Sequence, residues 1–445
     1  PAGRGRGGGV AAGATGAAGF GGVGTIEFRG SSGNFYFMEM NTRLQVEHPV
    51  TELITGLDLV EQMLRSAAGE TMAFKQDDLK INGWAIESRI YAEDPYRKFL
   101  PSIGRLVRYD PPAEGEQEGY TVRNDAGVRE GDEISMYYDP MISKLCTWAP
   151  TRLAAVDGMA RALEDFHIEG LGQNIPFLAA VMDQERFRSG QLATSYIADE
   201  FPDGFSGTAP TAFQTDVLTA AGLAMHRVMA ARAGSPTRHD WVVFVGHDRR
   251  AVQVAETAGA RAPTRCGPPP PPADGGRGPA QGPCPPRRAV QVAETAGTLS
   301  LTLGDRTLTL SDVDWRPGKA QFRARLDGRA FTVNVAPAAE GFVIRHRAAK
   351  QKVLVLSPRS AELHGKIPEK QPADTSKMII SPMPGLIISM NVEVGQTVRE
   401  GEIVCVIEAM KMQNIIRAEK EAVVKTVSAK GGDSVAADEV LVEFG

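Results

Sequence analysis

Lys411 lies at the centre of an internal repeat, within the tetrapeptide Ala-Met-Lys-Met. The stretches 385–408 and 422–444 each give an alternating apolar run, a glycine-containing turn and a second apolar strand, which is typical of hairpins. Two such copies predict a small flattened β-barrel, with Lys411 at the tip of the turn that joins them. A side chain at such a tip stands clear of the core, where an enzyme can reach it. We therefore predict that Lys411 is a carrier lysine, acylated on its Nζ atom.

Two glutamates occupy a second predicted hairpin, Glu27 on its first strand and Glu39 on its second. A turn centred on Gly33 would place them opposite each other, with their Cβ atoms about 5 Å apart. Like charges at that distance repel unless a cation lies between them, and carboxylate oxygens suit Mg²⁺ bound jointly with nucleotide phosphates. The pair thus indicates a divalent metal site, but a register slip of one residue would separate the two side chains.

The motifs around these residues resemble those of a known family. Residues 39–52 (EMNTRLQVEHPVTE) resemble the catalytic signature of biotin carboxylase, the ATP-grasp enzyme that carboxylates biotin with ATP and bicarbonate. The likeness continues through 54–60, 85–94 and 137–145. The Ala-Met-Lys-Met sequence resembles the biotinyl-lysine motif of biotin carboxyl carrier domains. A lipoyl domain has the same architecture and remains the alternative, although it usually has Asp-Lys-Ala at its lysine.

The resemblance implies a role for each motif residue. The implied set comprises Glu27, Glu39 and Asn41 for Mg²⁺ or Mn²⁺ and the ATP phosphates, Arg43 for steering bicarbonate and phosphate, Gln45 and Val46 for contacting bicarbonate, Glu47 as general base, Arg89 for stabilising the biotin enolate, and Lys411 for carrying biotin. The chemistry is consistent with these roles, because a carboxylate can take the proton of bicarbonate while fixed cations stabilise developing negative charge. For His48, which precedes Pro49, we favour a structural role.

The middle of the chain carries a helical pattern followed by alternating strands. The helix is predicted at 210–233, after a turn-rich linker at 201–207, and the strands lie between 241 and 356. This order resembles the domain with which propionyl-CoA carboxylase α subunits bind the carboxyltransferase β subunit. By that resemblance, the helix would lie inside a barrel of strands.

The predicted fold class is an α+β multidomain protein with a partial ATP-grasp biotin carboxylase, a helix-in-β-barrel docking domain and a flattened β-barrel biotinyl domain. The expected parts are a low-complexity start at 1–23, a truncated biotin carboxylase C-terminal region at 24–200, the docking helix and antiparallel barrel at 201–376 with a Pro/Gly-rich insertion at 260–286, and the biotinyl domain at 377–445. Identical copies of RRAVQVAETAG, at 249–259 and 287–297, flank the insertion.

The amino-acid composition excludes some classes of binding partner. The 445 residues are 42% apolar and 23% charged, with a net charge of −5, so we expect neither nucleic acid nor a membrane as partner. The 4 cysteines show neither zinc spacing nor a disulfide framework, which favours a reducing compartment. The expected location is the bacterial cytoplasm, or the mitochondrial matrix in a eukaryote.

Two functions remain open. The first is an α-subunit fragment of a biotin-dependent acyl-CoA carboxylase, with propionyl-CoA favoured over methylcrotonyl-CoA or acetyl-CoA as acceptor. The second is a carrier and docking protein without catalysis, because the sequence does not include an N-terminal ATP-binding half. On that ground, the chain alone is expected not to carboxylate biotin. The expected partners are the carboxyltransferase β subunit, biotin-protein ligase, ATP and bicarbonate, within a hetero-oligomer.

Overall fold

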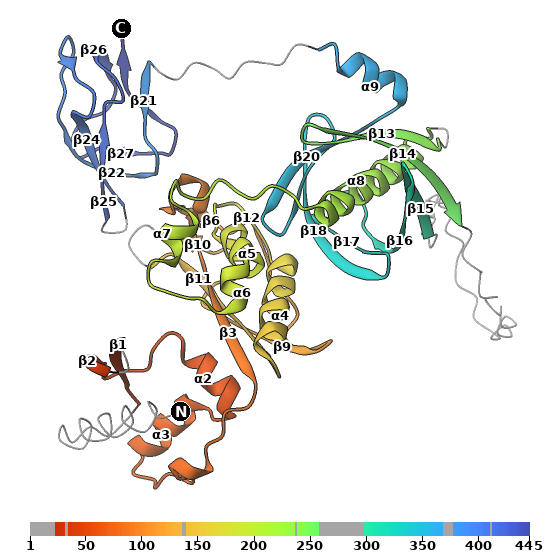
Figure 1. Cartoon of the computed structure of the whole chain (residues 1–445). Coiled ribbons are helices and arrows are strands. Elements are labelled where there is room, and N and C mark those ends of the chain that lie inside the picture. Colours follow the sequence, from red (N-terminus) through yellow and green to blue (C-terminus); the bar gives the residue numbers. More distant parts are fainter. Residues whose placement is uncertain are drawn as a thin grey trace, which may run out of the picture. The chain divides into compact units, whose positions relative to one another are not determined.

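The structure is a computed structural model that describes residues 23–31, 34–135, 139–235, 238–257, 298–367, 377–409 and 412–445. Lys411, the Pro/Gly-rich insertion and its second flanking copy lie outside the described residues. The chain divides into two compact units (Figure 1). The first comprises Pro1–Pro210, Arg345–Lys350 and Glu369–Gly445, and the second comprises Thr211–Ile344 and Gln351–Pro368.

The first unit begins with a hairpin and two helices. Strands β1 (Thr25–Ser31) and β2 (Asn34–Asn41) pair antiparallel, as predicted. Helix α2 (His48–Thr55) starts with Pro49 in its first turn and ends at Gly56, whose φ of 74° is the left-handed geometry that glycine adopts most easily. Helix α3 (Leu59–Ala67) begins where the Asp58 side chain accepts a hydrogen bond from the backbone N–H of Glu61.

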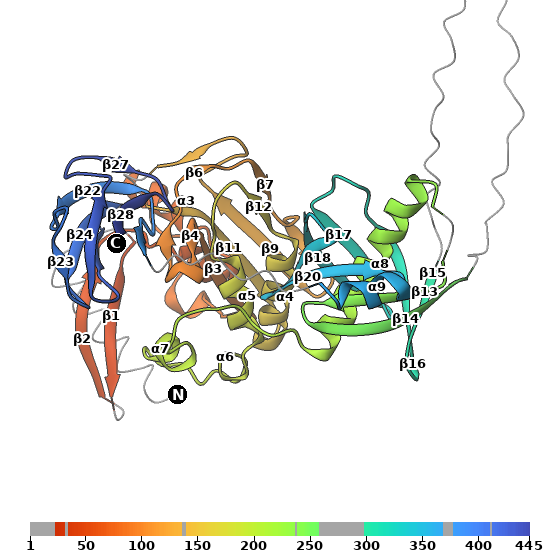
Figure 2. The same ribbon diagram turned by 90° about the horizontal axis from the view of Figure 1, so that it is seen from above.

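A four-stranded sheet follows, in the order β3-β11-β9-β8. Its strands are β3 (Trp84–Tyr91), β11 (Met141–Ala149), β9 (Tyr120–Ala126) and β8 (Gly115–Gln117). Helix α4 (Arg152–Asp165) contacts β3, β9 and β11 and packs in turn against α5 (Ile175–Asp183), an arrangement visible in Figure 2. The core between α4 and the sheet contains fully buried side chains from both elements, among them Leu145, Met159, Leu163 and Phe166. One face of the sheet is therefore apolar.

Short elements complete this region. They are the two-stranded pairs β4 (Glu93–Asp94) with β5 (Leu100–Pro101), β6 (Gly104–Arg105) with β10 (Glu133–Ile134) and β7 (Arg108–Asp110) with β12 (His167–Glu169), the helices α6 (Glu185–Ser189) and α7 (Tyr196–Glu200), and the 3-10 turns η1 (Gln76–Asp78) and η2 (Pro95–Arg97). The segment 201–207, predicted to be a linker, contributes to the core. Phe205 is 4% exposed, and its ring centroid lies 5.6 Å from that of Phe177 and 5.8 Å from that of Phe201.

The second unit is built around helix α8 (Ala212–Arg232), which lies within a closed barrel of eight strands (Figures 1 and 2). The strands are β13 (Asp240–Val245), β14 (Asp248–Thr257), β15 (Thr298–Leu303), β16 (Arg306–Asp314), β17 (Gln321–Leu326), β18 (Arg329–Pro337), β19 (Phe342–His346) and β20 (Ala349–Leu356), followed by helix α9 (Pro358–His364). Thr211 and Gln214 form a capping box at the start of α8. Val217, Leu218 and Leu223 are fully buried among the strands, so the predicted helix-in-barrel arrangement is confirmed.

Gly222 lies where α8 closely approaches the barrel wall, since a Cβ atom there would meet Val353 Cγ1 well inside van der Waals contact. Alanine normally stabilises a helix interior by about 1 kcal/mol over glycine. Here we expect the reverse: overpacking in Gly222→Ala should lower the free energy of unfolding by about 1–3 kcal/mol. Chemical denaturation would measure this, with Gly365→Ala as control because its Cβ would make only ordinary contacts. A Gly222→Ala protein as stable as the wild type would contradict the close approach.

The C-terminal part of the first unit consists of two four-stranded sheets, ordered β21-β28-β26-β23 and β25-β24-β22-β27. Its strands are β21 (Met378–Ile380), β22 (Gly385–Met390), β23 (Thr397–Val398), β24 (Ile403–Ala409), β25 (Met412–Arg417), β26 (Ala422–Val427), β27 (Ser434–Val435) and β28 (Val440–Phe444). The repeats interlock, because β23 pairs with β26 and β22 with β27. The aligned glycines Gly395 and Gly432 have matching φ values of 89° and 92°. The predicted flattened β-barrel of two copies is confirmed.

Candidate active site

The hairpin of β1 and β2 brings the predicted metal ligands together. Glu27 and Glu39 are Cα partners across the two strands, so the predicted register is confirmed. The Asn41 side-chain amide donates hydrogen bonds to Glu27 Oε1 at 2.9 Å and to Glu39 Oε1 at 3.3 Å. Hard carboxylate oxygens facing each other suit a divalent cation that phosphates and water would complete. In the described part of the chain, no cluster of three or more His, Cys, Asp or Glu residues could hold a metal ion. The hairpin therefore supplies two carboxylates and an amide, a set that fits Mg²⁺ shared with a nucleotide.

Gln45 connects this hairpin to the segment that carries the predicted base. Its side-chain amide donates to Glu27 Oε1 at 3.3 Å, and Glu47 follows two residues later. His48 Nδ1 lies 2.8 Å from the Gln45 carbonyl oxygen, in keeping with the structural role predicted for it. Val46 is half-buried, and the exposed Arg43 donates to the carbonyl of its neighbour Leu44 at 3.3 Å. Arg43 thus keeps a local contact and lies in solvent.

Glu47 and Arg89, 42 positions apart in the sequence, form an ion pair. Arg89 Nη2 donates to Glu47 Oε2 at 2.7 Å. Glu47 immediately precedes α2, and Arg89 lies on β3, which α2 contacts. The Glu47 and Arg89 side chains are 48% and 38% exposed, respectively. A carboxylate able to accept a proton and a guanidinium able to stabilise an anion therefore meet at an accessible edge of the sheet.

A buried carboxylate, Glu87, lies behind Arg89 on the same face of β3. Arg89 Nε donates to Glu87 Oε1 at 3.2 Å, and the Glu87 side chain is only 7% exposed. Burial raises the pKa of Glu87, an effect that the hydrogen bond and charge of Arg89 partly offset. Arg89 was among the predicted site residues, and Glu87 was not. The available signal was the strand period, since residues two apart on a strand share a face.

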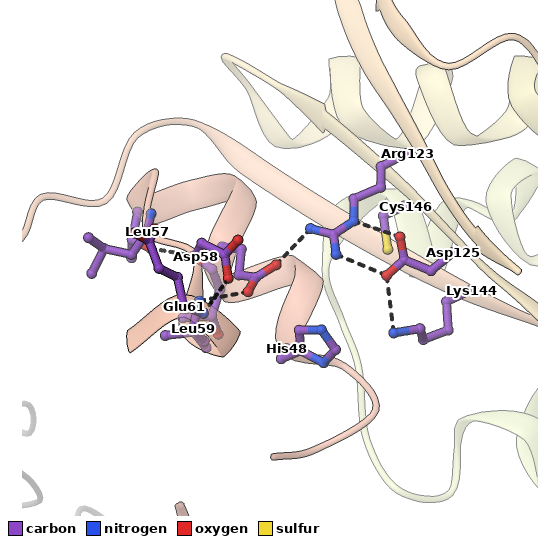
Figure 3. A network of polar contacts seen from close by, with 12 residues as sticks. His48, Leu57, Asp58, Leu59, Glu61, Arg123, Asp125, Lys144 and Cys146 are labelled. Carbon is purple, nitrogen blue, oxygen red and sulfur yellow. Dashed lines mark hydrogen bonds and ion pairs between the residues drawn. The ribbon is translucent and has the colours of Figure 1, made fainter. Parts of the chain in front are cut away.

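A second ion-pair network fastens α2 to the sheet (Figure 3). Arg123 on β9 donates to Glu52 Oε2 at 2.7 Å and to both carboxylate oxygens of Asp125 at 2.8 and 2.9 Å. The second oxygen of Glu52 accepts from the Leu59 backbone N–H at 2.8 Å, and Lys144 lies 3.2 Å from Asp125. Burial alone would raise the pKa of Asp125, but hydrogen bonds from Arg123 and Lys144 outweigh it and lower that pKa. The helix behind Glu47 is thereby held at a fixed place on the sheet.

The two networks occupy one charged face of the sheet. Residues that are Cα partners across β3, β11 and β9 form rows across the sheet. One row consists of Glu87, Cys146 and Arg123, and another, two residues further along β3, consists of Arg89, Lys144 and Asp125. Side chains two residues apart on a strand point the same way, so both rows face α2 while the intervening residues face α4. Burial raises the pKa of the Cys146 thiol, which therefore stays protonated in this layer. The sheet has an apolar side and a charged side, and the candidate site lies at the edge of the charged side.

Four family models match the chain. A carbamoyl-phosphate synthase L chain ATP-binding domain matches residues 9–75, and a biotin carboxylase C-terminal domain matches 87–199. A propionyl-coenzyme A carboxylase BT domain matches 285–370, and a biotin-requiring enzyme model matches 377–444. The matched models thus cover, in order along the chain, an ATP-binding region, a carboxylase C-terminal region, a BT domain and a biotin-requiring region, and the predicted fold class is confirmed.

Sequence comparison shows which carboxylases the chain resembles. The propionyl-CoA carboxylase alpha chain of Ruegeria pomeroyi is 47% identical over 455 residues, covering 96% of this chain and 61% of that protein. The mitochondrial propionyl-CoA carboxylase alpha chain of Rattus norvegicus is 38% identical, covering 95% of this chain and 54% of that protein. A solved biotin carboxylase domain of a thermophilic 2-oxoglutarate carboxylase, bound to bicarbonate, is 46% identical over 40% of this chain and 39% of that one, with a TM-score of 0.38.

The chain is therefore similar along almost its whole length to propionyl-CoA carboxylase alpha chains, and it spans 61% or less of those two relatives. The resemblance drawn from the motifs is confirmed. The relatives include a bacterial and a mitochondrial protein. Among the described residues, no helix has the length and apolar character needed to span a bilayer. The roles of the individual site residues remain predictions.

Proposed function

We propose that this chain acts as the α-subunit part of a biotin-dependent acyl-CoA carboxylase that uses propionyl-CoA as its acceptor. Two observations support this most strongly: the order of the matched carboxylase, BT and biotin-requiring models, and the 47% identity to a propionyl-CoA carboxylase alpha chain over 96% of this chain. The local geometry agrees, because two facing glutamates and an accessible Glu47–Arg89 pair are linked by the short segment 45–47. ATP, bicarbonate and biotin are the substrates and cofactor that such a subunit would use.

In this proposal, Glu47 takes the proton from bicarbonate held by Arg43, Gln45 and Val46, so that the resulting oxyanion can attack the γ-phosphorus of ATP. Glu27, Glu39 and Asn41 would hold Mg²⁺ or Mn²⁺, which neutralises charge on the phosphate oxygens. The attack on ATP would release ADP and leave the carboxyl group activated by the transferred phosphate. Biotin on Lys411 would supply the ureido nitrogen that takes this carboxyl group, while the phosphate leaves and accepts the proton of that nitrogen; the carboxyl group would then be delivered to a second site. Arg89 presents its guanidinium to the ureido oxygen, where negative charge develops.

Carboxyl transfer tests the proposed acceptor. Purified chain would be mixed with a carboxyltransferase β subunit, MgATP, labelled bicarbonate and one acyl-CoA at a time. The assay would be run in two forms. The first uses the chain alone. The second, which we call the supplemented assay, adds as a separate polypeptide the part of the Ruegeria pomeroyi alpha chain that this chain does not span. In the supplemented assay, we expect label to enter propionyl-CoA faster than methylcrotonyl-CoA or acetyl-CoA, whereas the chain alone should label none of them. Equal or greater labelling of either competitor would reject the acceptor, and no labelling of any acyl-CoA in the supplemented assay would favour the carrier and docking function.

The second unit is the part that we expect to bind the β subunit. Its barrel and α8 have a complete apolar core of their own, so removing residues 377–445 should leave the barrel folded. We expect the chain lacking 377–445 to co-purify with the β subunit as well as the full chain does. The matched comparison is the chain lacking 211–344 and 351–368, which keeps the first-unit turn Arg345–Lys350 and should lose the partner. Loss of binding on removal of 377–445 would place the interface in the C-terminal barrel instead.

A further inference from the structure

Arg89 is held between two carboxylates of different exposure. Its Nη2 atom donates to Glu47, which is 48% exposed, and its Nε atom donates to Glu87, which is 7% exposed. The two contacts use two different nitrogens of one planar guanidinium, so together they fix its position and restrict the orientation of its plane. The Glu47 contact is on the solvent side, whereas the Glu87 contact lies within the charged layer of the sheet.

Apart from Arg89, few groups near Glu87 could stabilise its negative charge while it is buried. Its second oxygen accepts a long hydrogen bond from Cys146 Sγ at 3.7 Å, and the positive charge of Lys144 acts on it from β11. Lys144 itself makes an ion pair with Asp125. A buried carboxylate without a close cationic partner would be strongly disfavoured. Arg89 is that close partner. Moving Arg89 away would therefore raise the free-energy cost of keeping the Glu87 carboxylate buried.

The contact of Arg89 with Glu47 cannot persist through the proposed reaction. When Glu47 takes a proton from bicarbonate it becomes neutral, and its charge-assisted hydrogen bond to Nη2 weakens. Nη2 is then available to the ureido oxygen of biotin at the stage when that oxygen gains negative charge. An arginine side chain that loses one partner gains rotamer freedom unless other groups hold it. Besides Glu87, the Tyr91 side chain also makes a hydrogen bond with Arg89. Glu87 does not take part in the proton transfer, so its contact with Nε remains.

We propose, on the basis of the proposed function, that Glu87 is a positioning residue that holds the Arg89 guanidinium in place when Glu47 releases it. Glu87 acts through Arg89 and does not touch the substrate. The Glu47 end of the guanidinium changes partner during the reaction, and the Glu87 end does not.

The kinetic test replaces Glu87 by glutamine, which keeps the shape and removes the charge. In the supplemented assay, we expect Glu87→Gln to lower kcat/KM for free biotin by about 10-fold to 100-fold, less than the ~10²–10³ typical of removing a stabilising donor itself. The KM for ATP should stay unchanged, because the ATP ligands lie on the β1–β2 hairpin. Glu87→Asp keeps the charge and should recover part of the loss. A purely structural role would instead lower the amount of active protein and leave kcat/KM for biotin per active site unchanged.

A second readout does not depend on turnover. In protein labelled with ¹⁵N in its arginine side chains, the Arg89 Nε–H signal can be identified by its disappearance in Arg89→Lys. We expect Glu87→Gln to speed hydrogen exchange at this Nε–H by at least about 10-fold, and Glu87→Asp to restore slow exchange. Unchanged exchange in Glu87→Gln would overturn the proposal. If the wild type shows slow exchange but no biotin-dependent turnover, the proposed function fails while the anchoring of Arg89 stands.

The matched control is Asp216 on α8, another buried carboxylate paired with arginine. Asp216 is 6% exposed in its side chain and accepts hydrogen bonds from Arg250 at 2.7 Å and from Arg306 at 3.1 Å. It belongs to the second unit, and Glu87 belongs to the first. Asp216→Asn should lower the stability of the barrel but change neither kcat/KM for biotin per active site nor the Arg89 Nε–H exchange. Equal effects of Asp216→Asn and Glu87→Gln on either quantity would show a general loss of stability and reject the positioning role.

Discussion

Replacing Lys411 by arginine is expected to abolish covalent biotin on this chain when it is expressed with biotin-protein ligase. The neutral amine of lysine can be acylated, whereas the arginine guanidinium stays protonated and cannot form the amide. The charge and the approximate length of the side chain are kept, so the fold should survive. Streptavidin blotting of the two proteins measures the effect, and the expected signal of Lys411→Arg is at background.

The control for Lys411→Arg is Lys425→Arg, an exposed lysine on β26 of the same domain. Its streptavidin signal should equal that of the wild type. Intact-mass measurement adds a second criterion, because a biotinyl group and a lipoyl group differ in mass. A biotin signal from Lys411→Arg as strong as the wild type would place the modification elsewhere, and a lipoyl mass would replace the biotinyl prediction with its alternative.

The two-copy C-terminal barrel could be predicted because each of its halves shows a local pattern. Strand alternation and the turn glycines Gly395 and Gly432 act over a few residues, so they are readable without the fold. The same is true of Glu27 and Glu39, whose register follows from one short hairpin. Pairing between Ala409 and Met412 then joins the halves around Met410 and Lys411, which lie outside the described residues. Local rules were sufficient at these places.

Contacts between distant segments could not be predicted in the same way. Arg123 and Glu52 are 71 positions apart, and no periodic pattern relates a residue of β9 to one of α2. Phe205 appeared in a turn-rich stretch of glycine, proline and serine, yet its ring is buried because Phe177 and Phe201 surround it. The turn Arg345–Lys350, between β19 and β20, clusters with the first unit, where Ala348 is 2% exposed and Arg347 makes ion pairs with Glu164 and Asp183. These placements depend on tertiary packing and not on the residues themselves.

The largest expected catalytic effect is that of Glu47→Gln on biotin-dependent ADP release. The amide has nearly the same shape as the carboxylate but cannot take a proton from bicarbonate, so the nucleophile would not form. Loss of a general base typically costs about 10²–10⁴-fold. We expect a decrease of that order in the supplemented assay with Mg²⁺, bicarbonate and free biotin. Binding of ATP should change little, because Glu27 and Glu39 lie on the hairpin and Glu47 pairs with Arg89 instead.

The matched control is Glu61→Gln on α3, a glutamate with similar exposure that also pairs with an arginine. Glu61 is 50% exposed and lies 2.7 Å from Arg65 on the surface of the helix. Exposed pairs of this kind are worth about 0–1 kcal/mol, so Glu61→Gln should leave ADP release unchanged. A comparable loss in both variants would mean that charge on this part of the surface, and not proton transfer, controls the rate. Full activity of Glu47→Gln would remove Glu47 from the role of base and leave its pairing with Arg89 as a structural contact.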